Sequence, residues 1–422
     1  MRLSILLHLI CQKLINMSGE VPSKKYEKSV KLIILMLLSL LMFAVTACSD
    51  KGRSDADTQL LSSVGDAVDS SEAITKIDSL ELSYATQFSV DYYSEGYIHI
   101  HIHIEDGNEY VIVPEGKPDN DLGFEGVTFI RRPADNIYLA ASSAMDLFAR
   151  LDGLDDIKAC STSAEDYSMP EVQSRIEDGI ITYVGKYSAP DYETLMGMGT
   201  DLAIESTMIY HTPEVKEQLE KFEIPVIVER SSYEEDPLGR LEWIKLYGII
   251  LGKEEMAESF FEEQSKAVQE LKDKLSQETV EKKTVAFFYV SSNGYINVRK
   301  PGDYLSKMIQ IAGGDYALGG IKLDEENALS TVNINWEDFY REAKDADILI
   351  YNGTIDGGIN SIDDLTAKNE LFSDFRAVRE GNVWCTNMNL FQETSKVKEV
   401  IEDFYTVINE EDAEPEFLYR VK

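Results

Sequence analysis

Ile137-Tyr138-Leu139-Ala140-Ala141 is the first of a series of short apolar runs separated by stretches with helical periodicity. The later runs of this series are Ile157-Lys158-Ala159-Cys160, Ile181-Thr182-Tyr183-Val184, Leu202-Ala203-Ile204 and Pro225-Val226-Ile227-Val228. Buried strands that alternate with helices are typical of a parallel sheet with helices on both faces. The series therefore predicts an α/β lobe over residues 127–235.

The same alternation returns in the C-terminal part of the chain. Its apolar runs are Thr284-Val285-Ala286-Phe287-Phe288-Tyr289-Val290, Ile348-Leu349-Ile350-Tyr351 and Val383-Trp384-Cys385. They predict a second lobe over residues 279–422. We therefore expect an α/β fold with two Rossmann-like lobes, each a parallel sheet with flanking helices. A chain with 44% apolar residues can bury two cores of this size.

The stretch between the lobes has one long helical pattern, from Asp236 to Gln277. Pro237 suits the first turn of a helix, and apolar residues then recur at three- and four-residue spacing from Trp243 onward. At about 1.5 Å per residue such a helix is about 60 Å long. We expect one backbone helix over residues 236–278 that joins the lobes rigidly.

Two alternating apolar runs lie further upstream, between Phe88 and Val113. They flank Glu105-Asp106-Gly107-Asn108, a sequence typical of a tight β-turn. This pattern predicts an extra N-terminal β-hairpin within an extension over residues 85–126. The sequence assigns the hairpin no role.

The N-terminal segment has the pattern of an export signal. Four lysines between Lys24 and Lys31 precede an uncharged apolar run that ends at Cys48, directly after small Thr46 and Ala47. This ending resembles the lipobox of bacterial lipoproteins, in which the cysteine is acylated. We expect a lipoprotein signal peptide over residues 1–47, beginning at Met1 or Met17, and a lipid anchor at Cys48. Residues 48–84, rich in polar residues, are expected to form a flexible tether.

Charge and cysteine content exclude several classes of protein. The chain has a formal net charge of −36, which disfavours binding to nucleic acid or to an anionic membrane surface and favours a soluble monomer. Beyond Cys48 only Cys160 and Cys385 remain, and both lie in apolar contexts. They are interpreted as buried thiols, since one pair is no disulfide framework.

Two lobes, a connecting helix and a lipobox together resemble the class III substrate-binding proteins of ABC importers, which serve iron-complex and cobalamin uptake. The resemblance covers roughly residues 127–407. It rests on the stretches 137–143, 185–193, 201–205, 236–240, 307–314, 335–337 and 347–350, in this order. It implies a ligand cleft between the lobes, where strand C-termini and helix N-termini face each other.

Segments that follow strands are expected to line this cleft. The ligand-binding candidates among them are Ser143, Tyr187, Arg230, Tyr233, Tyr295 and Arg299. Tyrosines offer a flat ring with a hydroxyl, and arginines offer paired donors for carboxylate or catecholate groups. The alternative for Arg230 and Arg299 is that each forms an ion pair with a neighbouring acid.

Glu193 and Glu337 occupy equivalent places in the two lobes, each at a helix start before a strand. In the class III family an acidic residue at this place in each lobe pairs with arginines of the permease, so the resemblance implies docking. The alternative is a favourable interaction with the helix dipole.

His99, His101 and His103 alternate along one strand and therefore share one face. Neighbouring pairs lie about 7 Å apart at Cα, so two of them could share a zinc ion while all three could hardly converge. The three are weak metal candidates, and the favoured interpretation is a partly solvated sheet face.

Taken together, these features predict an extracytoplasmic binding lipoprotein of an ABC importer. It is expected to capture a ferric siderophore or haem, or in second place cobalamin, and to deliver it to permease subunits. The expected location is the outer face of the cytoplasmic membrane of a Gram-positive organism. Enzyme motifs are missing from the sequence, and no cofactor is expected. A binding protein for free zinc or manganese, and a membrane-tethered hydrolase, remain as alternatives.

Overall fold

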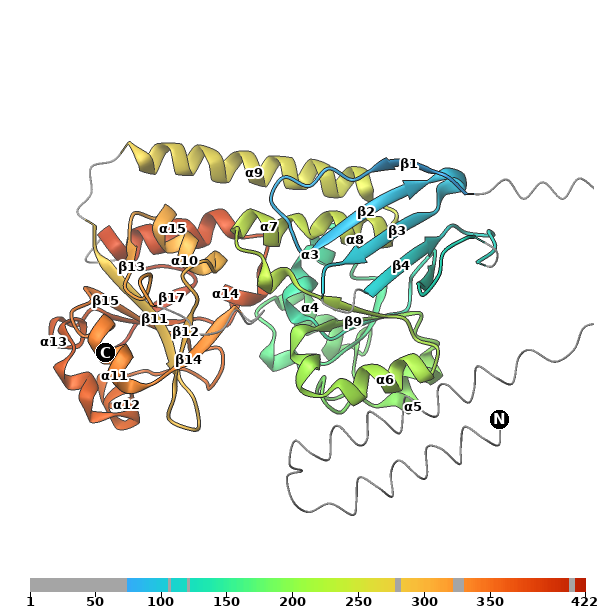
Figure 1. The fold of residues 1–422 in the computed structure, drawn as a ribbon. Coiled ribbons are helices and arrows are strands. Elements are labelled where there is room, and N and C mark those ends of the chain that lie inside the picture. The colour runs from blue at the N-terminus through green and yellow to red at the C-terminus, as the bar shows by residue number, and fades with distance from the viewer. Residues whose placement is uncertain (1–73, 105–107, 120–121, 278–281, 322–329, 410–413) are drawn as a thin grey trace, which may run out of the picture. The chain divides into compact units, whose positions relative to one another are not determined.

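The computed structural model of the 422-residue chain describes residues 74–104, 108–119, 122–277, 282–321, 330–409 and 414–422. The predicted signal segment, Cys48 and most of the predicted tether lie outside the described residues. Within them the chain forms three sheets (Figure 1).

The first lobe contains the predicted parallel sheet. Its strand order is β10-β9-β6-β7-β8, and all pairings are parallel. The strands are β6 (Ile137–Leu139), β7 (Ile157–Cys160), β8 (Thr182–Tyr183), β9 (Leu202–Ser206) and β10 (Val226–Glu229). The helices are α3 (Met145–Arg150), α4 (Pro170–Glu177), α5 (Tyr192–Met198) and α6 (Pro213–Lys221). Each strand lies on one of the apolar runs. Strands β6, β7, β9 and β10 are mostly buried, as expected for a sheet covered on both faces, whereas the edge strand β8 is partly exposed.

The second lobe has a parallel centre with antiparallel flanks. Strands β11 (Thr284–Val290), β15 (Ile348–Tyr351) and β16 (Val383–Thr386) are parallel, as predicted. Strands β12 (Ile296–Arg299), β14 (Thr331–Ile334) and β17 (Leu418–Arg420) add antiparallel pairings, and β13 (Asp315–Tyr316) pairs with β11. The helices are α10 (Tyr304–Ile311), α11 (Trp336–Ala343), α12 (Ile362–Lys368), α13 (Arg376–Glu380), α14 (Asn389–Gln392) and α15 (Val397–Asn409). The predicted parallel strands therefore form the centre of a mixed sheet, and its antiparallel flanks were not predicted.

The N-terminal extension is larger than a hairpin. The predicted hairpin is present as β3 (Ile98–Ile102) and β4 (Asn108–Val113), within a five-stranded sheet of order β1-β2-β3-β4-β5. The other strands are β1 (Lys76–Ser79), β2 (Phe88–Tyr93) and β5 (Thr128–Arg131). Two predicted boundaries move, since β1 lies in the expected tether and β5 in the expected first lobe.

The continuous helix predicted for residues 236–278 is wrong. The connection consists of α7 (Pro237–Glu242), α8 (Ile244–Leu251) and α9 (Glu254–Ser276). Gly252 ends α8 in the left-handed region at φ +68°, where glycine is favoured. Helix α9 then packs against α8 and returns along the molecule (Figure 1). Its 23 residues span about 35 Å, not 60 Å.

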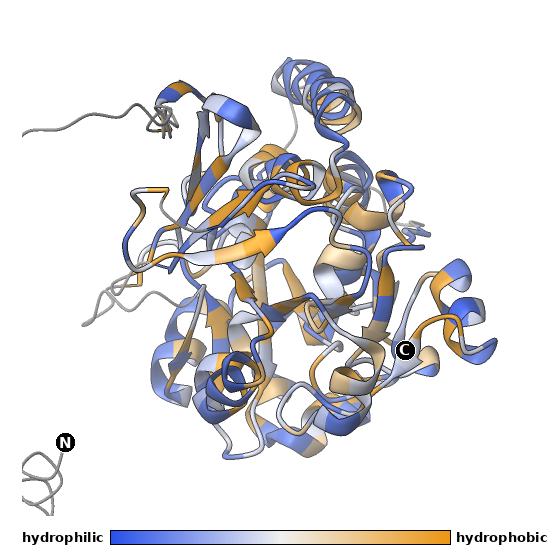
Figure 2. Cartoon of the chain, turned by 90° about the vertical axis from the view of Figure 1, so that its right-hand side faces the viewer, coloured by the Kyte–Doolittle hydropathy of each residue, from blue (hydrophilic) through white to orange (hydrophobic). Residues whose placement is uncertain are grey.

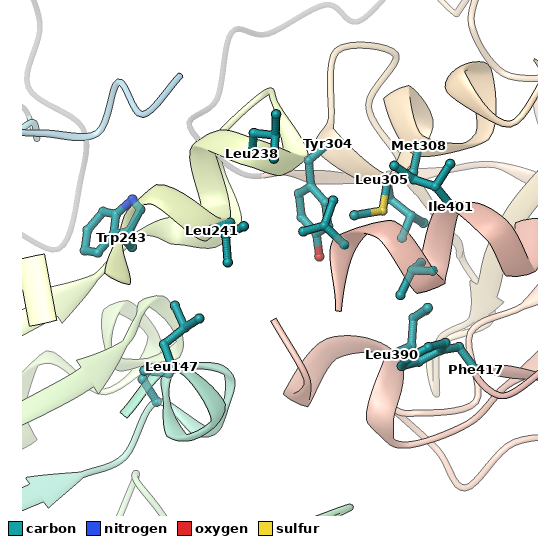
Figure 3. Close-up of a cluster of buried hydrophobic side chains, with 14 of the residues drawn as sticks. Leu147, Leu238, Leu241, Trp243, Tyr304, Leu305, Met308, Leu390, Ile401 and Phe417 are labelled. Atoms are coloured by element: carbon teal, nitrogen blue, oxygen red, sulfur yellow. The ribbon is translucent and has the colours of Figure 1, made fainter. Parts of the chain in front are cut away.

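One cluster of buried hydrophobic side chains runs through all three sheets. It contains Phe88 of the N-terminal sheet, Leu147 of the first lobe, Trp243 of the connection and Leu305 of the second lobe. Figure 3 shows the part of this cluster around α7, where side chains of both lobes meet. Apolar strands lie inside the molecule and polar helix faces lie outside (Figure 2). The lobes and the sheet therefore share one core.

Two carboxylates fasten the N-terminal sheet to the connection. Glu242 accepts hydrogen bonds from the backbone N–H groups of Ser83, Tyr84 and Ala85, at 2.8–3.1 Å. Glu234 accepts from the backbone N–H groups of residues 86 and 87 and from the indole of Trp243. Backbone donors that would otherwise be left unpaired on docking are thereby satisfied.

We expect Glu242→Gln to destabilise the protein by about 2 kcal/mol. The amide loses the charge that strengthens three backbone hydrogen bonds, and it breaks the 3.2 Å ion pair with buried Lys245. Urea unfolding followed by tryptophan fluorescence measures the loss. The matched control is Glu263→Gln on the exposed face of α9. Equal unfolding midpoints for the two variants would contradict the role given to Glu242.

Candidate functional site

The two lobes touch where the C-terminal strand edge of the first lobe meets the segment after β16. The Thr394 hydroxyl donates to the Ser143 carbonyl at 2.8 Å, and the Ser395 N–H donates to the Asp146 carboxylate at 2.6 Å. Because β6, β9 and β10 are parallel, the segments that follow them meet at this same edge. This edge is the predicted position of a ligand cleft.

Ser143 lies at this edge, but its polar groups have partners within the protein. Its hydroxyl donates to the Glu229 carboxylate at 3.4 Å. Glu229 is 3% exposed and also accepts the Ser231 N–H at 2.7 Å. Burial raises the pKa of Glu229. The predicted serine therefore belongs to a buried polar group that holds the first lobe's edge together.

Arg230 and Tyr233 are brought into direct contact by the structure. The Arg230 guanidinium lies 4.4 Å from the centre of the Tyr233 ring. Its Nη1 donates to the Tyr210 hydroxyl at 3.1 Å, and its Nε and Nη2 donate to the Gln87 amide oxygen at 3.3 and 3.1 Å. Among the described residues, no carboxylate forms an ion pair with Arg230. The alternative considered from the sequence, an ion pair between Arg230 and a neighbouring acid, is therefore not observed among the described residues.

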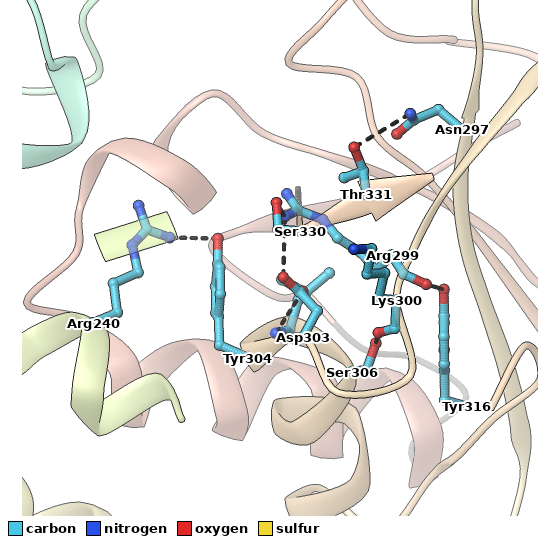
Figure 4. Close-up of polar contacts among 11 residues, drawn as sticks. Arg240, Asn297, Arg299, Lys300, Asp303, Tyr304, Ser306, Tyr316, Ser330 and Thr331 are labelled. Carbon is cyan, nitrogen blue, oxygen red and sulfur yellow. Dashed lines mark hydrogen bonds and ion pairs between the residues drawn. The ribbon is translucent and has the colours of Figure 1, made fainter. Parts of the chain in front are cut away.

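Arg299 has the partner that Arg230 lacks. Its Nη1 lies 3.5 Å from the Asp303 carboxylate and 3.3 Å from the Ser330 hydroxyl (Figure 4). The guanidinium also lies 4.9 Å from the centre of the Phe391 ring. Burial raises the pKa of Asp303, and the nearby Arg299 opposes that shift. The charge of Arg299 is therefore balanced inside the second lobe, which is the alternative considered from the sequence.

Arg240 of α7 connects this second-lobe cluster to the rest of the molecule. It donates to the Tyr304 hydroxyl (Figure 4). It also donates to the Phe391 carbonyl at 2.9 Å. It also stacks on the Tyr304 ring at 4.8 Å. Arg240 was not among the predicted site residues, because the sequence indicated only that it lies near the start of the connecting helix.

Tyr187 and Tyr295 lie apart from the contact between Arg230 and Tyr233. Tyr187 follows β8 and packs against a smaller cluster of buried hydrophobic residues in the first lobe, which includes Val184 and Leu195. Tyr295 is 53% exposed in the turn between β11 and β12. The structure thus unites two of the six predicted ligand residues, and it adds Gln87 and Tyr210 to them.

The sequence matches the family described as periplasmic binding protein over residues 140–388. The chain belongs to this family. Its two-lobed fold is that of the class III substrate-binding proteins of ABC transporters. The predicted two-lobed α/β architecture and the predicted family are therefore confirmed.

Curated relatives add no function. An uncharacterized lipoprotein of Methanocaldococcus jannaschii is 26% identical over 243 residues, which are 57% of this chain and 56% of the relative. An uncharacterized protein of the same organism is 28% identical over 240 residues, or 55% of this chain and 67% of the relative. The match thus spans little more than half the length of the first relative.

Solved structures share the fold at low identity. A periplasmic heme binding protein from Pseudomonas aeruginosa has a TM-score of 0.55 and 15% identity, covering 68% of this chain and 98% of that chain. A periplasmic binding protein from Veillonella parvula has a TM-score of 0.54 and 14% identity, covering 73% and 97%. Identity this low carries the fold and nothing about the ligand.

Glu193 and Glu337 take equivalent positions in this periplasmic binding protein. Both are exposed residues in the first turns of α5 and α11. Each follows a capping residue, Asp191 or Asn335, whose side chain accepts a backbone N–H. Neither glutamate has an ion-pair partner within the part of the chain that the structure describes. In Figure 1 both helices lie on the side of the molecule away from α9.

His99 and His101 alternate along β3 and His103 directly follows this strand, so the three share one sheet face, as predicted. His99 contacts Glu109 at 2.9 Å, and His103 contacts the Thr86 carbonyl at 2.7 Å. The rings of His101 and His103 lie 5.0 Å apart. The described residues contain no group of three or more His, Cys, Asp or Glu side chains placed to hold a metal ion. Cys160 and Cys385 are buried free thiols, as predicted.

A surface cavity of about 450 Å³ lies away from the strand edge, between Ser83-Tyr84 and α9. Buried Lys245 at its wall already pairs with Glu242 and Glu258. The other lysine that lines it, Lys266, lies 3.9 Å from Glu270, so the described lining residues offer no unpaired cation to an anionic ligand. Among the described residues, no helix is both long and apolar enough to cross a bilayer.

Glu205 is fully buried near the end of β9. Neither of its carboxylate oxygens has a hydrogen-bond partner in the described structure, and the nearby Tyr138 hydroxyl also has none. Burial raises the pKa of Glu205 to about 8. The side chain is therefore largely protonated at neutral pH, because an unpaired carboxylate is costly in an apolar environment.

We expect Glu205→Gln to stabilise the protein in alkaline solution. The folded state holds a proton that the unfolded state releases above about pH 4.5, so stability falls between that pH and about pH 8. The slope from one such group approaches about 1.4 kcal/mol per pH unit. The neutral glutamine removes this loss, so the variant should exceed wild type by about 1 kcal/mol or more at pH 8 and by less at pH 5. Urea unfolding at both values measures the difference, and a pH-independent difference would contradict the assignment.

Proposed function

We propose that this periplasmic binding protein captures an anionic iron complex, a ferric siderophore or haem, and delivers it to the permease of an ABC importer. Cobalamin is the second candidate ligand. The observation that carries the proposal is Arg230. Its side chain is buried to 6% exposure beside the cleft edge, with no carboxylate in ion-pair contact among the described residues.

A buried guanidinium without a counter-charge is costly, since burial removes the water that would otherwise solvate it. A ligand carboxylate, propionate or catecholate would supply the missing charge and accept charge-assisted hydrogen bonds. The chain as a whole has a net charge of −36, so its general field repels anions. A local cation at the cleft is therefore what an anionic ligand needs.

A binding protein for free zinc or manganese is the nearer rival. Such a site needs several histidine or carboxylate ligands that converge on one point. Instead, His99 contacts Glu109 and His103 contacts the Thr86 carbonyl, and the described residues contain no group of three or more His, Cys, Asp or Glu side chains placed to hold a metal ion. This arrangement supports a chelated rather than a bare metal.

We expect Arg230→Gln to weaken binding of anionic iron complexes about 30-fold or more, because the ligand loses its buried cationic partner. Tryptophan quenching titrations with haemin, a ferric tris-catecholate and cyanocobalamin measure the affinities. Arg175→Gln, on the surface of α4 and paired with Asp155, is the matched control and should bind as wild type does. Unchanged affinity for the anionic complexes in Arg230→Gln would refute the proposed role, and exclusive binding of cyanocobalamin would favour the second candidate.

Docking onto the permease is proposed to use Glu193 and Glu337. Their exposure, their matched positions in the two lobes and their lack of ion-pair partners within the described residues support this use. A carboxylate on each lobe would allow two permease arginines to hold both lobes at once.

Reversing both charges, Glu193→Lys with Glu337→Lys, should reduce uptake about tenfold or more while ligand affinity stays unchanged. Cations at these positions would repel the proposed permease arginines. Uptake of radiolabelled iron complex into proteoliposomes that contain the permease measures the effect. The control reverses Glu255 and Glu263 on α9, away from α5 and α11. Normal uptake by the first double variant would rule out docking through these residues.

We further propose a lipid anchor at Cys48, which lies outside the described residues. The lipobox-like ending of the signal segment supports it, as does the naming of one relative as a lipoprotein. A tether keeps the binding protein near its permease, so moderate docking affinity is sufficient. The proposed place is the outer face of the cytoplasmic membrane of a Gram-positive organism.

A further inference from the structure

Gln87 connects the N-terminal sheet to the proposed ligand site. It lies between the turn fastened by Glu234 and the start of β2 at Phe88. Its N–H donates to Glu234 at 3.0 Å, and its carbonyl accepts the N–H of His103 at 2.9 Å. The backbone of this residue is thus fixed by Glu234 on one side and by His103, the residue after β3, on the other.

The Gln87 side chain reaches the Arg230 guanidinium. Its amide oxygen accepts from Arg230 Nε at 3.3 Å and from Nη2 at 3.1 Å, and its amide nitrogen donates to the Thr86 hydroxyl at 3.3 Å. Since arginine has donors only, the oxygen must be the atom that faces it. The two residues are 143 positions apart in sequence.

A neutral amide holds Arg230 without balancing its charge. With the Tyr210 contact, three of the five N–H groups of the guanidinium donate to the protein, which leaves two for another acceptor. The Tyr233 ring covers one face of the group at 4.4 Å. The guanidinium is therefore fixed in position while it keeps its charge and part of its donor capacity, as a preorganised anion site requires.

We infer that the N-terminal sheet is part of the ligand site, in which Gln87 is a positioning residue that orients Arg230 toward an anionic group of the ligand. This inference rests on the proposed function. It gives the extension, to which the sequence assigned no role, a place in ligand recognition. The ligand class it selects bears a carboxylate or catecholate, because a neutral ligand gains nothing from an uncompensated cation.

The test uses the variants Gln87→Glu and Gln87→Ala in the full folded chain, with haemin and a ferric tris-catecholate as anionic probes. Gln87→Glu places a carboxylate against Arg230, so it should lower the affinity for both probes at least tenfold while the protein remains as thermally stable as wild type. Gln87→Ala should lower it several-fold, because the guanidinium is no longer held. Lys117→Gln, in the same sheet region and paired with exposed Glu95, should bind as wild type does.

A double-mutant cycle separates positioning from a merely structural effect. If Gln87 acts through Arg230, Gln87→Ala should cause no further loss of affinity in an Arg230→Gln background. An equal further loss in that background, or wild-type affinity in Gln87→Glu, would overturn the inference alone. Failure of the wild-type protein to bind either anionic probe would overturn the proposed function, and the inference with it.

Discussion

The buried carboxylates of Glu234 and Glu242 hold together parts of the chain that are far apart in sequence. Between them they bind the backbone of residues 83–87, the Trp243 indole and the Lys245 ammonium group. Both acids flank or belong to α7, the helix that lies between the lobes. The close approach also excludes a larger residue at Gly239, where an added Cβ would lie 2.9 Å from the Tyr84 carbonyl. Placement of the N-terminal sheet, and with it of Gln87, depends on these contacts.

The sequence predicts the strands and helices that follow from local periodicity, but it does not predict a turn that depends on a single residue. Apolar runs such as Thr284–Val290 form strands, because a strand that is covered on both faces needs a nearly continuous apolar sequence. The helical pattern from residue 236 to residue 277 continues across Gly252, yet the left-handed conformation there reverses the chain. Apolar periodicity shows which face of a helix is buried. It does not show where one helix ends and the next begins when the residues on both sides of the turn have helical spacing.

In the candidate site, too, contacts between residues close in sequence could be predicted, whereas contacts between distant residues could not. Arg230 and Tyr233 are three residues apart, so their proximity could be predicted from the strand end. Gln87 could not be predicted, because a pairing over 143 positions depends on how the sheet docks. Arg230 directly follows β10 and Arg299 is the last residue of β12, and only the structure distinguishes their surroundings. Asp303, four residues after Arg299, balances that charge, whereas the acid next to Arg230, Glu229, bonds to Ser231 and Ser143 instead.

The shared core constrains how the lobes can move when ligand binds. Leu147, Leu241 and Leu305, from the first lobe, the connection and the second lobe, belong to one buried cluster (Figure 3). Arg240 adds hydrogen bonds from α7 into the second lobe. Wide hinge opening would expose this apolar surface at a cost of about 25 cal/mol per Å². Small tilts that keep the cluster buried are therefore favoured. A site that opens so little must be formed in advance, and a guanidinium fixed by an amide and a tyrosine ring is suited to that requirement.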